Sequence, residues 1–225
     1  MISTSIITLR GTTPNKEFWP EEEVRKYTTE MKAVTITVNF TVEGKQMILS
    51  LDNFEKLLRK AYRIAISDCE CRTRVKACNA PVDVCIYMNE GADEQIEKGR
   101  GKEVSLEQAL DAIRRAHEAG LVHTAFSDIN GKEPQYICSC CSCCCHTFPA
   151  MQRFGFSDYL ISSEMIAAQD DDKCDDCGLC VGTCHFKARN IVDGRLKYDK
   201  EKCFGCGVCI PSCPNGAISM KNRHN

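Results

Sequence analysis

The sequence lacks the features that mark several common classes of protein. Its 29 Lys and Arg are nearly balanced by 31 Asp and Glu, which leaves a net charge of −2. Because nucleic acids and anionic membranes attract strongly basic surfaces, this balance predicts no nucleic acid as a partner. No stretch approaches the roughly 18 uninterrupted apolar residues of a membrane-spanning helix, so we expect no direct insertion into a membrane.

Signals for export and for nucleotide binding are also missing. Residues 1–11 have no basic start, no long apolar core and no evident cleavage site, so we expect a cytoplasmic protein. No glycine-rich phosphate loop follows a strand pattern, and no flavin or nicotinamide fingerprint occurs. A self-contained dehydrogenase is therefore disfavoured.

Cysteine, by contrast, is abundant, with 18 residues in a chain of 225. In a reducing cytosol such thiols bind metals or take part in redox chemistry and do not form disulfides. The first 68 residues contain no cysteine. The 18 cysteines form four groups, at residues 69–85, 138–145, 174–184 and 203–213.

Apolar residues alternate with polar or small ones from residue 34 to residue 42, which predicts one strand of a hairpin. The alternating residues are Val34, Ile36, Val38, Phe40 and Val42. A turn at 43–45 leads to a second strand at 46–49. Asp52 then offers a helix N-cap, and the helical spacing continues to Ile64 or Ala65, so we expect this helix to end at the first cysteine group.

A second helix is predicted by a capping-box pattern at Ser105 and Gln108 and by an apolar stripe that follows it. Gly120 ends this helix, because glycine readily takes the left-handed conformation found just beyond a helix C-terminus. Residues 89–103 are rich in Gly, Glu and Lys and predict a solvated loop.

The last quarter of the chain contains an internal repeat, in which residues 172–188 align without gaps on residues 201–217. Each copy carries the spacing CxxCxxCxxxC. Three thiolates spaced in this way can wrap one iron–sulfur cubane, and in the two-cluster arrangement the fourth ligates the other cluster. The predicted ligands are Cys174, Cys177, Cys180 and Cys213 for cluster 1, and Cys203, Cys206, Cys209 and Cys184 for cluster 2.

These two runs resemble the bacterial-type ferredoxins with two 4Fe-4S clusters, over about residues 165–220. The resemblance implies an electron-transfer domain that exchanges electrons with redox partner proteins. The expected fold is α+β, with an N-terminal hairpin-plus-helices cysteine-rich module at 1–157 and a dicluster ferredoxin-like domain at 158–225. One departure is His185, which follows Cys184 where the second run has Cys213-Pro214.

Ten further cysteines lie upstream of the repeat. They are Cys69, Cys71, Cys78, Cys85, Cys138, Cys140, Cys141, Cys143, Cys144 and Cys145. Six thiols within eight residues cannot all be buried as inert side chains, and the Cys-Ser alternation turns several of them to one side of an extended segment. We therefore predict at least one further iron–sulfur cluster, most simply 4Fe-4S, with ligands drawn from these ten.

The segments Asp68–Arg72 and Asn79–Cys85, together with the later cysteine-rich run, resemble a module that accompanies ferredoxin domains in anaerobic bacteria and archaea. This resemblance implies no particular chemistry. Three interpretations stay open: a non-catalytic electron carrier, which the sequence favours, a redox enzyme with a catalytic upstream iron–sulfur site, and a zinc-binding interaction module fused to a ferredoxin.

Overall fold

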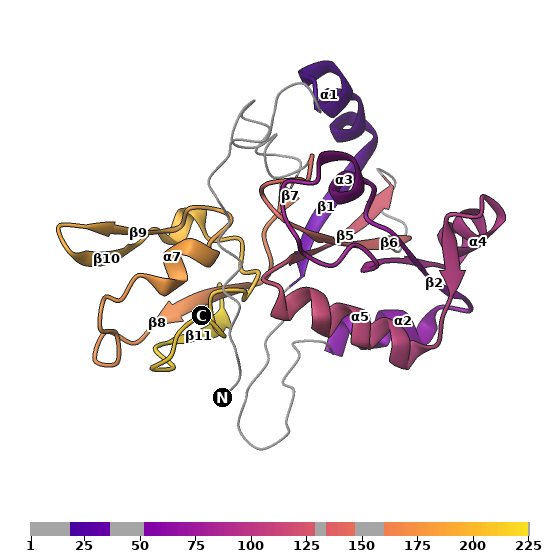
Figure 1. The fold of residues 1–225 in the computed structure, drawn as a ribbon. Coiled ribbons are helices and arrows are strands. Elements are labelled where there is room, and N and C mark those ends of the chain that lie inside the picture. The colour runs from indigo at the N-terminus through magenta and orange to yellow at the C-terminus, as the bar shows by residue number, and fades with distance from the viewer. Residues whose placement is uncertain (1–18, 37–51, 129–133, 147–159, 225) are drawn as a thin grey trace.

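The computed structural model describes residues 19–36, 52–128, 134–146 and 160–224 (Figure 1). A seven-stranded sheet in the order β4-β2-β3-β6-β5-β1-β7 forms the centre of the upstream part. Its strands are β1 Met31–Ile36, β2 Ile64–Ser67, β3 Cys85–Met88, β4 Gly101–Glu103, β5 Val122–Asp128, β6 Tyr136–Cys140 and β7 Leu160–Ile161. The helices of this part are α1 Glu21–Glu30, α2 Asp52–Lys60, α3 Glu70–Val75, α4 Glu90–Glu97 and α5 Leu106–Glu118.

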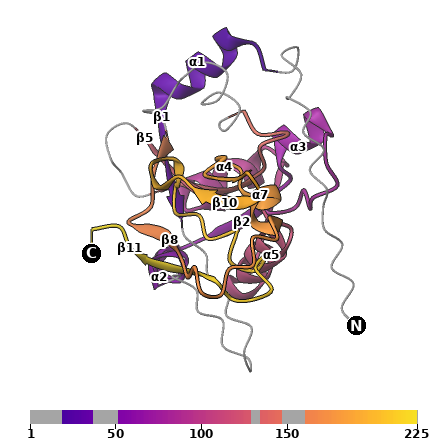
Figure 2. The ribbon, with the colours of Figure 1, turned by 90° about the vertical axis from the view of Figure 1, so that its left-hand side faces the viewer.

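The C-terminal part contains two small antiparallel sheets, β8 with β11 and β9 with β10. Its elements are β8 Met165–Gln169, α7 Leu179–Thr183, β9 Arg189–Val192, β10 Arg195–Tyr198, the 3-10 helix η2 Lys200–Lys202 and β11 Ile218–Asn222. Figure 2 shows this part in front of the upstream sheet. Both parts mix helix and strand, which confirms the mixed fold class. Within the described residues, every helix is too short or too polar to cross a membrane.

Helix α5 forms where the capping box predicts it. The Ser105 hydroxyl accepts from the Gln108 backbone N–H at 3.2 Å, and the Gln108 side chain accepts from the Ser105 N–H at 2.9 Å. Gly120 follows the helix with φ of 71°. Helices α2 and α5 lie side by side along the sheet (Figure 1), and Leu58 and Ile113 share a core with sheet residues such as Ile86.

Two predictions from the sequence are wrong. Helix α2 ends at Lys60, and Ile64 and Ala65 belong to strand β2, which pairs with β3 and β4. The helical spacing continued there by coincidence, because buried apolar residues of a short central strand also fit a helical template. Residues 89–103 form helix α4 and strand β4 instead of a loop. The sequence did not predict helix α4 because the helix has no apolar stripe: Ala92 is its one buried residue.

Strand β1 covers the first part of the predicted hairpin, but its partners are distant in sequence. It pairs antiparallel with β5 and parallel with β7, where Ala33 faces Leu160. Residues 37–51, with the predicted turn and second strand, lie outside the described residues. Leu160 and Ile161 therefore complete the upstream sheet, and the small sheets begin with β8.

The repeat seen in the sequence is also a repeat of backbone geometry. Gly178 and Gly207 occupy matched positions with φ of 74° and 77°. The salt bridges Lys173–Asp170 and Lys202–Asp199, each at 2.9 Å, are likewise matched. Such agreement between two copies shows that both segments build the same local structure around their cysteines.

Candidate metal centres

The structure brings together the four cysteines predicted for cluster 1. They line one common site, although one of the four comes from the second repeat copy. The lining cysteines are Cys174, Cys177, Cys180 and Cys213. Cys177 is exposed, so this site lies close to the molecular surface.

The four cysteines predicted for cluster 2 also line one common site. They are Cys184, Cys203, Cys206 and Cys209. Phe186 and Phe204 stack beside them with ring centroids 4.5 Å apart. Both aromatic rings, with Val208, pack against Phe126 and Cys145 of the upstream part. This second site therefore lies against the upstream module.

Backbone donors serve equivalent thiols in the two copies. The Ala188 N–H donates to Cys184 Sγ at 3.3 Å, and the Ala217 N–H donates to Cys213 Sγ at the same distance. Hydrogen bonds of this kind stabilise thiolate ligands and tune the clusters that they hold. Four convergent thiols and amide donors to sulfur fit a cubane in each case.

Arg189 is a buried residue of this region that the sequence did not single out. It is 1% exposed, donates to Gln169 Oε1 at 2.8 Å and lies over the Tyr198 ring at 4.4 Å. Burial lowers its pKa, but Cys209 and Cys180 beside it raise the pKa overall. One cation thus lies beside a thiol of each quartet. A comparison of the two repeat copies could have singled out Arg189, because the second copy has Ile218 at the matched position.

The ten upstream cysteines divide into two groups. Four of them have sulfur atoms that all lie within 4.8 Å of one another; we call these four the tight set. The tight set is Cys78, Cys141, Cys143 and Cys144. It joins the loop after α3 to the segment after β6.

The other six upstream thiols form a ring that faces a large open pocket; we call them the thiol ring. They are Cys69, Cys71, Cys85, Cys138, Cys140 and Cys145. The pKa shifts of these thiols show that they influence one another around the ring: Cys69 influences Cys71 and Cys85, Cys138 influences Cys85 and Cys140, and Cys145 influences Cys140 and Cys71. Hydrogen bonds from its two neighbours lower the pKa of Cys69 to about 3.

The alternation of Cys and Ser in β6 places the cysteines of this strand on one side, as the sequence predicts. Cys138 and Cys140 face the pocket, whereas Ser139 points to the other side of the strand. There the Ser139 hydroxyl donates to the Val84 carbonyl at 3.1 Å, and its oxygen lies 3.0 Å from His123 Nδ1. Burial lowers the pKa of His123 to about 3, so this histidine is a neutral structural residue.

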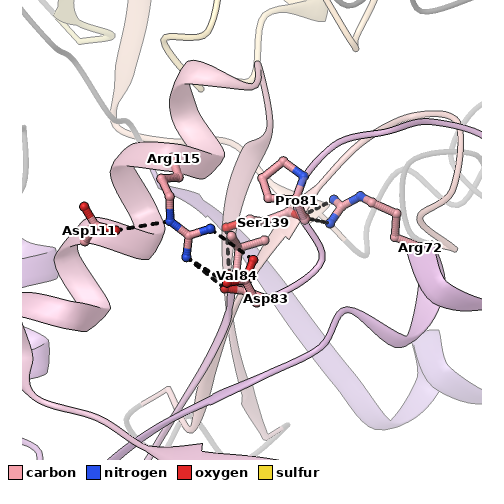
Figure 3. A network of polar contacts seen from close by, with 7 residues as sticks. All are labelled: Arg72, Pro81, Asp83, Val84, Asp111, Arg115 and Ser139. Carbon is pink, nitrogen blue, oxygen red and sulfur yellow. Dashed lines mark hydrogen bonds and ion pairs between the residues drawn. The ribbon is translucent and has the colours of Figure 1, made fainter.

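Arg72 holds the two cysteine-bearing segments together (Figure 3). It is 2% exposed and donates to the carbonyl oxygens of Pro81 at 2.5 Å and Ser139 at 2.8 Å. Its guanidinium also lies 3.9 Å from Cys141 Sγ. Burial opposes its charge, but Cys69 and Cys141 raise its pKa overall, so it supplies a positive charge beside the thiols. Arg74, in contrast, pairs with Glu23 and lies 4.3 Å over the ring of the buried Trp19.

His185 connects the repeat to the upstream cysteines. Its Nδ1 accepts from the Ser142 backbone N–H at 3.3 Å, and its Nε2 donates to the Gly120 carbonyl at 2.7 Å. Burial lowers its pKa, in agreement with a neutral ring. The residue that replaces the expected proline is therefore a bridge between the second quartet and the cysteine-rich segment. His146, the other histidine near a cysteine, lies at the pocket with Nδ1 3.3 Å from Cys71 Sγ.

Comparison with known families identifies one match. A 4Fe-4S binding domain family matches residues 196–219, a segment that contains all four cysteines of the second run. No curated protein matches the sequence. The chain thus contains a ferredoxin-like iron–sulfur segment with a site for at least one 4Fe-4S cluster, as the spacing of its cysteines predicts.

Proposed function

We propose that this chain is an electron-transfer protein with two 4Fe-4S clusters in its C-terminal part and a further iron–sulfur centre at the thiol ring. One observation carries the proposal: each repeat copy contributes three cysteines to one site and its fourth to the other. A cubane, when bound, takes up and releases one electron with little rearrangement. Two interleaved quartets therefore favour a relay over a single structural site.

The residues around the three proposed centres support an order in which an electron would pass from one centre to the next. The first quartet includes the exposed Cys177, and the second packs through Phe204 and Val208 against Cys140 and Cys145 of the thiol ring. An electron would enter or leave at the exposed quartet and travel through the second quartet toward the upstream module. Apolar packing around the second quartet excludes water from the middle of that path.

Acidic residues mark where a redox partner would dock. Asp171, Asp172 and Asp175 are exposed close to Cys177. Complementary charge steers association and sets orientation, so a partner with a basic surface fits this edge of the molecule. Neutralising these three carboxylates should slow the reaction with such a partner, more at low than at high ionic strength.

The test is an anaerobic count of iron and acid-labile sulfide on the full chain, together with its paramagnetic resonance spectrum after reduction. Two cubanes and one upstream cluster give about twelve irons, with sulfide in similar amount. Cys203→Ser should remove iron from the second quartet, whereas Cys138→Ser should remove it from the thiol ring. If both variants keep the full count, these cysteines are not cluster ligands and the proposal fails.

A second candidate function is a redox enzyme, and the pocket favours it. Besides the thiol ring, the pocket is lined by Trp19, Arg72, Tyr87 and His146, which could hold a small polar substrate beside a cluster. Cyanide, a small anion that binds open iron positions, distinguishes the two functions. A change in the spectrum of the upstream centre would support the enzyme, and an unchanged spectrum would support the electron carrier.

A further inference from the structure

The tight set differs from every other cysteine group of the described chain in how closely its sulfur atoms approach. Cys78 Sγ lies 3.8 Å from Cys141 Sγ and 3.8 Å from Cys144 Sγ. Cys143 Sγ and Cys144 Sγ are also 3.8 Å apart, and all four atoms lie within 4.8 Å of one another. The sulfurs thus touch one another and leave no room for a cluster between them.

This spacing fits one metal ion. Four thiolates at the corners of a tetrahedron, each about 2.3 Å from a central zinc, have sulfur atoms about 3.8 Å apart. Ligands of a cubane stand further apart, because each binds a different iron of the cluster. Among the described residues, the sulfurs of the two repeat quartets do not all come within the 4.8 Å that the tight set shows, although each quartet lines one common site.

The surroundings of the tight set also suit a charged four-thiolate site. Arg72 places its guanidinium 3.9 Å from Cys141 Sγ, which offsets part of the negative charge of four thiolates around a divalent ion. The indole N–H of the buried Trp19 donates to the Cys144 carbonyl at 3.0 Å. The Cys145 N–H donates to the Cys141 carbonyl at 3.1 Å and closes a tight turn. These contacts hold the segment in the shape that collects its three cysteines around Cys78.

We propose that Cys78, Cys141, Cys143 and Cys144 bind a single divalent ion in tetrahedral thiolate coordination, separate from every iron–sulfur cluster of the chain. Zinc and iron both take this geometry. The ion ties the loop after α3 to the segment after β6, and through Cys145 and Cys140 it fixes one side of the thiol ring. This site does not depend on the electron-transfer function, because a tetrahedral ion would stabilise the module in either case.

The experiment compares zinc, iron and acid-labile sulfide in the full chain purified without oxygen. The expected wild type carries one zinc, or one iron in excess of sulfide, per chain. Cys143→Ser should lose this one ion and keep the sulfide count. The matched control, Cys138→Ser in the thiol ring, should keep the ion. Loss of several irons together with sulfide from Cys143→Ser would show that the tight set ligates a cluster and would overturn the proposal.

A second measurement covers the case in which Cys143→Ser does not fold. Cobalt supplied in place of zinc should give the visible spectrum of a tetrahedral four-thiolate site in the wild type. Cys143→His leaves a Cys3His set, which is also common for zinc, so it should keep the ion and shift the cobalt bands. An unchanged cobalt spectrum in this variant, or its complete absence in the wild type, contradicts the single-ion site.

Discussion

The two cysteine-rich regions of the molecule bring their thiols together in opposite ways. In the C-terminal part, eight cysteines follow a regular spacing, and matched hydrogen bonds at Cys184 and Cys213 repeat from one copy to the next. In the upstream part, ten cysteines come from segments that meet only because β3, β5 and β6 pair in one sheet. Local spacing brings together three thiols of each C-terminal quartet, whereas tertiary structure brings together the upstream thiols.

The largest expected effect concerns Arg72, the buried arginine that links two cysteine-bearing segments of the upstream region. Arg72→Leu removes two charged hydrogen bonds and leaves the Pro81 and Ser139 carbonyls without this donor, at a cost of about 3 kcal/mol or more. We expect the upstream metals to be lost while the C-terminal cubanes remain, as measured by metal content and paramagnetic resonance. The control is Arg59→Leu, whose guanidinium pairs with Glu55 on the surface of α2, away from the cysteines. Equal metal loss in both variants would show that Arg72 has no special role.

The next effect concerns a close backbone contact in the C-terminal region. Gly205 has φ of 73°, and a Cβ there would lie 2.0 Å from the Met165 carbonyl oxygen. Gly205→Ala should therefore lower the free energy of unfolding by at least about 2 kcal/mol. Gly216→Ala is the matched control, since it has φ of 60° and open space around it, and should cost about 1 kcal/mol. Thermal unfolding of the loaded protein would measure both, and equal losses would contradict the contact.

A smaller effect tests His185, which links the second quartet to the upstream cysteine-rich segment. His185→Pro gives the first copy the Cys-Pro pair of the second, and removes the contacts with Gly120 and Ser142. We expect a loss of about 1–2 kcal/mol in unfolding free energy, together with slower electron transfer between the two regions. Pro214→His is the matched control and should leave that transfer rate unchanged. If His185→Pro also leaves it unchanged, the bridge does not position the second quartet.

The smallest effect is a shift in reduction potential. Arg189 lies beside Cys180 and Cys209, and its positive charge would stabilise the reduced, more negative form of the two proposed clusters. Arg189→Leu should lower both potentials by on the order of 60 mV, equivalent to about 1.4 kcal/mol for one electron. Arg195→Leu, at an exposed position, should change them little. Potentiometric titration measures the shift, and a change in only one potential would show that the cation serves one quartet.

The sequence predicts the parts of the molecule that depend on neighbouring residues. The capping box of α5 and the repeat could be predicted because each is a pattern of residues along the chain. Helix α4 was missed because its surface is polar on nearly all sides, and β2 was mistaken for helix because a four-residue strand has too few positions to show its period. Arg189 and the division of the upstream thiols depend on contacts between distant segments, which spacing along the chain cannot reveal.

The most direct test of the electron-transfer proposal is Mössbauer spectroscopy of the full chain grown on isotopically enriched iron. This measurement counts cubane iron separately from other iron in one sample. Two cubanes from the repeat predict about eight irons of 4Fe-4S type, with the iron of the thiol ring in addition. The cubane signal should fall by about four irons in Cys203→Ser, because that variant disables one quartet. A wild-type chain with only about four cubane irons, or a Cys203→Ser variant with an undiminished signal, would contradict the two-cluster relay.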